Sequence, residues 1–131
     1  MASRSKGGAP ALPVLVPQRS GCPIASTLDL VGDKWTLVIV RDLLTGKSHF
    51  SQFLDSPEGI STNILASRLK ALEDAGIVSR SLYQAQPPRH AYTLTPRGEA
   101  LLQVLQAICR WGNAQIEKTW TPPAWFMEKR V

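Results

Sequence analysis

Cysteine is scarce in this chain: only Cys22 and Cys109 occur, far apart and without a Cys-x-x-Cys or His-x-x-x-His pattern beside them. Neither a disulfide framework nor a zinc site is therefore indicated. No apolar run approaches the roughly 20 residues of a membrane-spanning helix. Three prolines also interrupt an N-terminal stretch that faintly resembles a signal peptide. We expect a cytoplasmic protein with no membrane segment, no metal and no cofactor.

Charge is also sparse, and it is unevenly placed. Charged residues make up 19% of the chain, the net charge is +5, and the positive excess lies in residues 1–20 and 61–98. This distribution suits a polyanionic partner, although an ordinary solvated surface accounts for it equally well. The length of 131 residues favours a single domain. We expect the folded part at 21–118, preceded by a flexible basic arm at 1–20 and followed by an aromatic, proline-rich tail at 119–131.

Helix boundary signals predict three helices in the first half of the chain. Pro23 suits the first position of a short amphipathic helix that Gly32 ends. Asp33 can cap a second helix at 34–45, which is apolar on most of its surface and is expected to be the central buried element. Ser51 can cap a third helix of one to two turns.

The next helix, expected at 62–75, has the clearest boundary signals in the sequence. Ser61 is suited to its N-cap and Gly76 to the left-handed position just after its end. Its buried stripe is expected to consist of Leu65, Leu69 and Leu72. At 100° per residue the opposite face is polar and consists of Asn63, Ser67, Lys70 and Asp74.

A hairpin and a long helix are predicted to follow. The strands are expected at 78–84 and 91–95, joined by a loop that holds Pro87, Pro88, Arg89 and His90. Thr95 can cap a helix from Pro96 to about Lys118, whose apolar face is too wide for one neighbour. We expect part of this helix to pack on a second copy of the chain, which makes the protein a homodimer. The aromatic tail either covers that dimer face or lines a pocket.

The order helix, helix, hairpin predicts an α+β, mainly α fold. We expect a winged helix-turn-helix with a two- to three-stranded wing sheet and a C-terminal dimerisation helix. One helix fits the major groove of B-DNA, and a β-ribbon beside it reaches the backbone or the minor groove. On the helix, the residues expected to contact bases or phosphate are Ser61, Thr62, Asn63, Ser67, Arg68 and Lys70. On the hairpin they are Arg89 and His90. An ordinary solvated face is the alternative for the helix, but the basic hairpin favours DNA.

Several motifs together resemble the HxlR family of bacterial regulators. They are CPIASTLD at 22–29, GDKW at 32–35, GIS at 59–61, LKALEDAG at 69–76, PPR at 87–89, YTLT at 92–95, and Gly98. The resemblance covers about residues 21–112. It implies a MarR-like winged-helix homodimer that binds operators near its target genes, with the helix from Ser61 as the recognition helix and the loop around Arg89 as the wing. His49, and the pair His90 and Ala91, depart from the usual family pattern.

Cys22 is a second candidate site. It stands at the N-cap of the helix that begins at Pro23, where free N–H groups and the helix dipole favour a reactive thiolate. The resemblance implies regulation through a cysteine at this place, so we hypothesise thiol sensing at Cys22. The alternative is a buried cysteine that serves as a small hydrophobic residue, the role we expect for Cys109.

We expect a regulator of double-stranded DNA, a repressor in function, without catalytic activity. Three alternatives stay open at this point: a winged helix used for protein contacts, a small redox enzyme built on Cys22, and a regulator that responds to a small aromatic effector held in an aromatic-lined cleft. The run Gly46-Lys47-Ser48 resembles the end of a phosphate-binding loop, but that motif needs glycine where Arg41 stands. We therefore exclude nucleotide binding.

Overall fold

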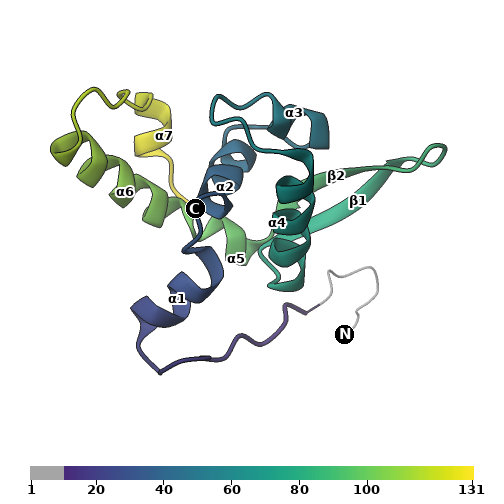
Figure 1. Ribbon diagram of the computed structural model, residues 1–131, viewed down its shortest axis with the longest axis horizontal. Helices are drawn as coiled ribbons and strands as arrows, with labels where there is room; N and C mark the ends of the chain where they lie inside the picture. The colour runs from purple at the N-terminus through teal and green to yellow at the C-terminus, as the bar shows by residue number, and fades with distance from the viewer. Residues whose placement is uncertain (1–10) are drawn as a thin grey trace.

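The computed structural model describes residues 11–131. They form a body of helices from which a short hairpin projects (Figure 1). The elements are α1 (Pro23–Val31), α2 (Thr36–Leu44), α3 (Phe50–Leu54), α4 (Thr62–Asp74), β1 (Val78–Gln84), β2 (Arg89–Leu94), α5 (Pro96–Glu99), α6 (Leu102–Gln115) and α7 (Ala124–Glu128). None of the helices in this part of the chain is long and apolar enough to cross a bilayer. The fold is mainly helical with one antiparallel hairpin, as the sequence predicts.

The segment before α1 was expected to be part of a flexible arm. Residues 1–10 lie outside the described part of the chain, and residues 11–20 contain no helix or strand. Arg19 nevertheless contacts α1, because its Nε donates to Asp29 Oδ1 at 2.7 Å. The last residues of the expected arm are therefore attached to the folded part.

The predicted start of α1 is confirmed, whereas α2 begins later than predicted. Pro23 is the first residue of α1, and Gly32 follows its end. The Asp33 carboxylate accepts hydrogen bonds from the backbone N–H groups of Trp35 and Thr36, both at 3.0 Å. The N-cap is nevertheless Trp35 and the helix begins at Thr36 rather than at residue 34, so the predicted cap at Asp33 is wrong by two residues. Asp33 satisfies the first amides of α2 from outside the helix.

The predicted cap of α3 is wrong. The N-cap is His49 rather than Ser51, and Phe50 is already the first helical residue. The Gln52 side chain makes the difference, because its Oε1 reaches back and accepts from the backbone N–H groups of Ser48 and His49 at 2.8 and 2.9 Å. Two amides that precede the helix are satisfied in this way.

Both ends of α4 form as predicted. Ser61 Oγ accepts from the backbone N–H of Ile64 at 3.3 Å. At the other end, Gly76 has a φ of 71° and the N–H of Ile77 donates to the carbonyl of Leu72 at 2.9 Å, which is the Schellman arrangement. The stripe of Leu65, Leu69 and Leu72 is buried in the core.

The hairpin begins its return strand earlier than predicted. β2 starts at Arg89, so Arg89 and His90 belong to the strand and not to the loop, which is reduced to residues 85–88. The cause is pairing that extends to the end of the ribbon, with His90 opposite Leu82 and Arg89 opposite Gln84 across an irregularity in β1. His49 adds a single bridge to Ala91 beside this two-stranded sheet.

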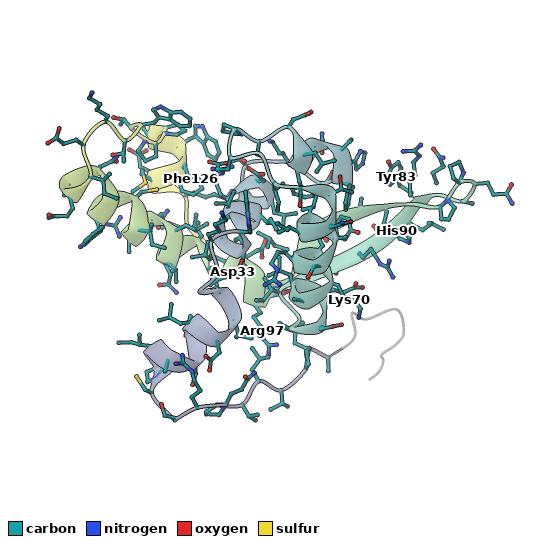
Figure 2. All side chains as sticks on the ribbon, in the orientation of Figure 1. Asp33, Lys70, Tyr83, His90, Arg97 and Phe126 are labelled. Carbon is teal, nitrogen blue, oxygen red and sulfur yellow. The ribbon has the colours of Figure 1, made fainter. Side chains whose placement is uncertain are left out.

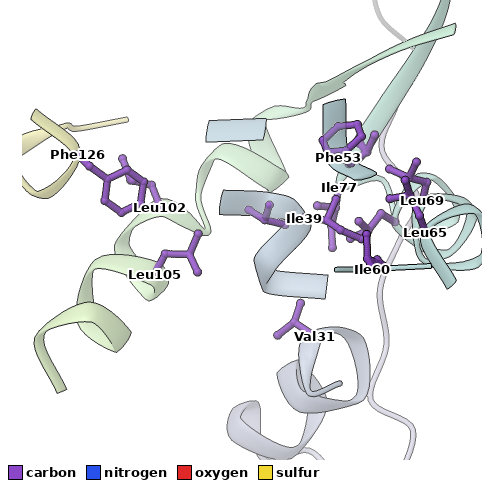
Figure 3. Packing of buried hydrophobic residues seen from close by; sticks show 13 residues of the cluster. Val31, Ile39, Phe53, Ile60, Leu65, Leu69, Ile77, Leu102, Leu105 and Phe126 are labelled. Carbon is purple, nitrogen blue, oxygen red and sulfur yellow. The ribbon is translucent and has the colours of Figure 1, made fainter. Parts of the chain in front are cut away.

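The helix predicted from Pro96 to Lys118 is divided into α5 and α6 and ends at Gln115. α5 packs directly on the backbone just before β1, and Gly98 makes this close contact possible. A Cβ at this position would lie 2.2 Å from the carbonyl oxygen of Ile77. The tail after α6 folds back as α7. Phe126 of α7 joins the core cluster that runs from α1 through α4 to the tail (Figure 3).

Candidate nucleic-acid interface

The face of α4 opposite its leucine stripe is open to solvent. Ser61, Thr62, Asn63 and Ser67 are exposed along it. Lys70 is exposed as well, but its Nζ donates to Asp74 Oδ1 at 2.7 Å, and this hydrogen bond raises the pKa of Lys70. A polar stripe thus starts at the N-cap of α4 and ends in an i, i+4 ion pair.

Arg68 lies between this stripe and the start of α2. Its Nη1 is 3.8 Å from Asp33 Oδ1, and the side chain is half-buried. Burial acts to raise the pKa of Asp33, but the hydrogen bonds from Thr36 and Trp35, together with Arg68, outweigh it and lower that pKa. The ion pair directs Arg68 toward the cap of α2, so this guanidinium is less free to reach a ligand than the exposed side chains are.

The hairpin presents the second part of the predicted interface. Arg89 is exposed and forms no ion pair with any residue from 11 to 131, whereas His90 is half-buried. Tyr83 and His90 lie on the hairpin at the same end of the molecule as Lys70, away from Phe126 in the tail (Figure 2). The structure therefore brings α4 and the hairpin together on one side.

His49 joins the hairpin to α3, a contact that the sequence patterns did not indicate. Its ring stacks on Tyr83 with centroids 4.3 Å apart and planes 4° apart. Backbone pairing accompanies the stack, since the N–H of Tyr92 donates to the carbonyl of Ser48 at 2.8 Å. These contacts set the direction of the hairpin relative to the helices.

A buried polar network, which we name the Asp42 network, holds the turn before α4. It consists of Arg41, Asp42, Lys47, Ser56 and Glu58. Asp42 is only 4% exposed, although it lies in the mostly apolar α2. Its carboxylate accepts from Ser56 Oγ and, at 2.9 Å, from Arg41 Nη2. The single acid in this apolar helix was the only sequence signal for the network.

Arg41 extends the Asp42 network to the surface. It holds Glu58 through two hydrogen bonds of 2.7 and 2.8 Å. The hydrogen bonds from Arg41 lower the pKa of Glu58, and the bond to Glu58 raises the pKa of Arg41. Ser56 and Glu58 lie just before Ser61, so the network ties the N-terminus of α4 to α2.

Cys22 occupies the N-cap of α1, as the sequence predicts, and it is exposed. No other part of residues 11–131 buries this cysteine, in contrast to the buried alternative. Cys109 is partly buried and packs against the core, in agreement with its predicted role. No cluster of three or more metal-ligating side chains occurs among residues 11–131.

A capped, polar-faced helix beside a projecting basic hairpin defines a winged helix-turn-helix protein. The sequence pattern of the HxlR-like helix-turn-helix family matches residues 30–120. The chain belongs to this family, which is one of transcriptional regulators and not of enzymes.

Known relatives agree with this assignment. The chain is 39% identical to the HTH-type transcriptional regulator sll1512 of Synechocystis sp. over 97 residues, which cover 74% of this chain and 72% of that protein. Among solved structures, the redox regulator HypR in its oxidized form has a TM-score of 0.66 and 32% identity, covering 73% of this chain and 99% of HypR. The reduced form of the regulator YodB from B. subtilis has a TM-score of 0.62 and 34% identity, covering 76% of this chain and 98% of YodB.

Proposed function

We propose that this transcriptional regulator binds a specific operator duplex as a homodimer and represses transcription there. In this proposal α4 enters the major groove and the β1–β2 hairpin follows the neighbouring backbone or minor groove. The observation that carries it is the exposed polar stripe of α4, which starts at Ser61 and lies on the same side of the molecule as the hairpin (Figure 1). The hairpin carries Arg89, which is exposed and forms no ion pair within residues 11–131. A helix used only for protein contacts does not require a basic hairpin beside it.

Asn63 is the residue of α4 best suited to read a base. It is exposed in the first turn, and an asparagine side chain can form two hydrogen bonds with adenine. We expect Asn63→Ala to weaken operator binding about 10- to 100-fold, the usual value of one bidentate base contact. Affinity for unrelated duplex should not change. Fluorescence anisotropy with DNA from upstream of the gene and its neighbours, against unrelated duplex, measures both.

Gln18→Ala is the matched control for this experiment, because Gln18 is an exposed amide before α1, outside α4 and the hairpin. It should leave both affinities unchanged. Equal affinity of the unaltered protein for upstream and unrelated DNA would contradict operator binding. An equal loss on both duplexes in Asn63→Ala would instead assign Asn63 to the backbone.

Arg89 is expected to contact phosphate rather than bases. We expect Arg89→Ala to weaken binding to all duplexes by a similar factor and to reduce the slope of log affinity against log salt by about 1, because one fewer counterion is released. Titrations at four salt concentrations give the slope. Arg130→Ala, at an exposed arginine near the C-terminus, is the control and should keep the original slope; an unchanged slope in Arg89→Ala would remove Arg89 from the interface.

Dimerisation is supported by apolar side chains that α1 and α6 leave exposed. They are Ile24 and Leu28 on α1, and Ile108 and Trp111 on α6. On each helix the two residues lie about one turn apart, and exposed apolar side chains grouped in this way are typical of an interaction site. A two-fold dimer would present two copies of α4 to half-sites about 34 Å apart, one turn of the duplex.

A redox response through Cys22 is a second candidate function. Two observations favour it: the thiol is exposed at the start of α1, and HypR, a structural neighbour, is a redox regulator. We expect an oxidant or a quinone to release DNA from the unaltered protein and not from Cys22→Ser. Operator anisotropy before and after treatment measures the release. Cys109→Ser, the control, should respond like the unaltered protein; release that persists in Cys22→Ser would assign the response elsewhere.

A further inference from the structure

A pocket of about 660 Å³ lies between α2, α6 and the tail, and it is separate from the proposed DNA-binding face. Its volume is within the range of about 300–1,000 Å³ that small-molecule sites occupy. Most of its wall is carbon, contributed by Leu37, Val38, Leu105, Trp120, Pro122 and Phe126. The tail therefore lines a pocket, one of the two placements that the sequence left open.

The charged groups at the pocket are already neutralised by one another. Arg41 and Asp42 contribute to its wall, but Arg41 is bound to Asp42 and to Glu58. Lys47 also lines it and donates to Ser56 Oγ at 2.8 Å. A charged ligand would lose its hydration without gaining a free counter-charge. The wall chemistry thus fits an uncharged aromatic or alicyclic molecule.

The tail is held in place on both sides of the segment that closes the pocket. Gln106 Nε2 donates to the carbonyl groups of Phe126 and Lys129 at 3.0 and 2.8 Å. Asn113 Nδ2 donates to Thr119 Oγ1 and to the carbonyl of Trp120 at 2.9 and 3.0 Å. Because these bonds and the buried Phe126 fix the wall, a ligand would not have to order it, and that favours binding.

We propose that this pocket is the binding site for an uncharged aromatic or alicyclic small molecule. Arg41 and Asp42 both line the pocket and hold the turn before α4. Occupancy therefore changes operator affinity. This effect of ligand binding on operator affinity rests on the proposed function, whereas the binding itself does not.

N-phenyl-1-naphthylamine, a neutral fluorescent probe, tests the binding without DNA. We expect saturable binding of one probe per chain. We expect Val38→Trp, which fills the pocket, to weaken it about 10-fold or more, since the ring would occupy the ligand's volume. Val131→Trp is the matched control, because Val131 is an exposed valine that lies outside both this pocket and the proposed dimer face. Circular dichroism checks that both variants fold.

Cys109 supplies a measurement that does not depend on the variants of Val38. Cys109 is one of the residues that line the pocket, so in the Cys22→Ser background bound probe should slow its alkylation by iodoacetamide at least threefold. Unsaturable binding, or unchanged alkylation at saturating probe, would overturn the site. Loss of binding confined to Val131→Trp would place the probe near the C-terminus and overturn the site too. Ile108, which is part of the proposed dimer face, also lines the pocket. Dissociation of Val38→Trp into monomers would therefore assign the cavity to the second copy and overturn the site.

The link to DNA is measured separately. Saturating probe should change operator affinity at least threefold in the unaltered protein and leave it unchanged in Val38→Trp. If probe binds but operator affinity stays constant, the coupling is overturned while the site stands. If no operator is found, the proposed function fails and the probe measurements still decide the site.

Discussion

A chain carrying Trp111→Glu is expected to sediment as a monomer at concentrations at which the unaltered chain is a dimer. Trp111 is 65% exposed on α6, and Ile108, one turn before it, is 48% exposed. In the proposed homodimer both would be buried, and a carboxylate at position 111 would lose its hydration without a partner. Operator affinity should fall by about 100-fold or more, because the two copies of α4 would no longer bind as one linked unit.

Sedimentation velocity and operator anisotropy on the same samples measure the two effects. Trp125→Glu is the matched control: it is the same substitution at a tryptophan that is 53% exposed, but on α7. This variant should remain dimeric and keep its operator affinity. If Trp111→Glu stays dimeric, the interface lies elsewhere; if it becomes monomeric and still binds the operator at full affinity, the linked two-site arrangement is wrong.

The position of α1 and α6 makes this interface compatible with DNA binding. Both helices lie toward the side of the body away from the hairpin (Figure 1). A partner that covers Trp111 and the apolar residues of α1 would leave the polar stripe of α4 uncovered. The proposed dimer and DNA surfaces therefore do not compete for the same residues.

The parts of the site that the sequence predicted are those with local causes. α4 is specified by its cap Ser61, by Gly76 after its end and by the stripe of leucines between them. Each of these signals acts over one turn of helix, so it can be recognised without knowledge of the rest of the fold. The exposure of the polar face then follows from the burial of the leucines on the other side.

The parts that the sequence did not predict depend on contacts between distant segments. The early start of β2 at Arg89 depends on pairing with β1, and the stack of His49 on Tyr83 joins residues 34 positions apart. The division of α5 from α6 accompanies the close approach of Gly98 to Ile77. Helical periodicity contains none of this information, because it reports only which face of an element is apolar.

The Asp42 network is the most consequential of these distant contacts, and its removal gives the largest expected loss of stability. We expect Asp42→Ala to lower the free energy of unfolding by about 3 kcal/mol, the low end for breaking a buried ion pair. Ser56 would lose its acceptor. Arg41 would lose one acceptor but keep Glu58, and it is partly solvated, which limits the loss. Urea unfolding at a fixed protein concentration and pH 7 measures the difference.

Two further variants identify the cause of this loss of stability. One removes the charge of Asp42 but keeps a hydrogen-bond acceptor, and the other removes an acidic residue outside the network. Asp42→Asn keeps an oxygen acceptor for Ser56 and should cost less than Asp42→Ala. Asp55→Ala removes an exposed aspartate at the end of α3 and should stay within about 0.5 kcal/mol of the unaltered chain. Equal stabilities of Asp42→Ala and Asp55→Ala would contradict a stabilising network. Because the network fixes the turn before Ser61, a destabilised Asp42→Ala chain should also bind the operator more weakly than Asp55→Ala does, even where both are fully folded.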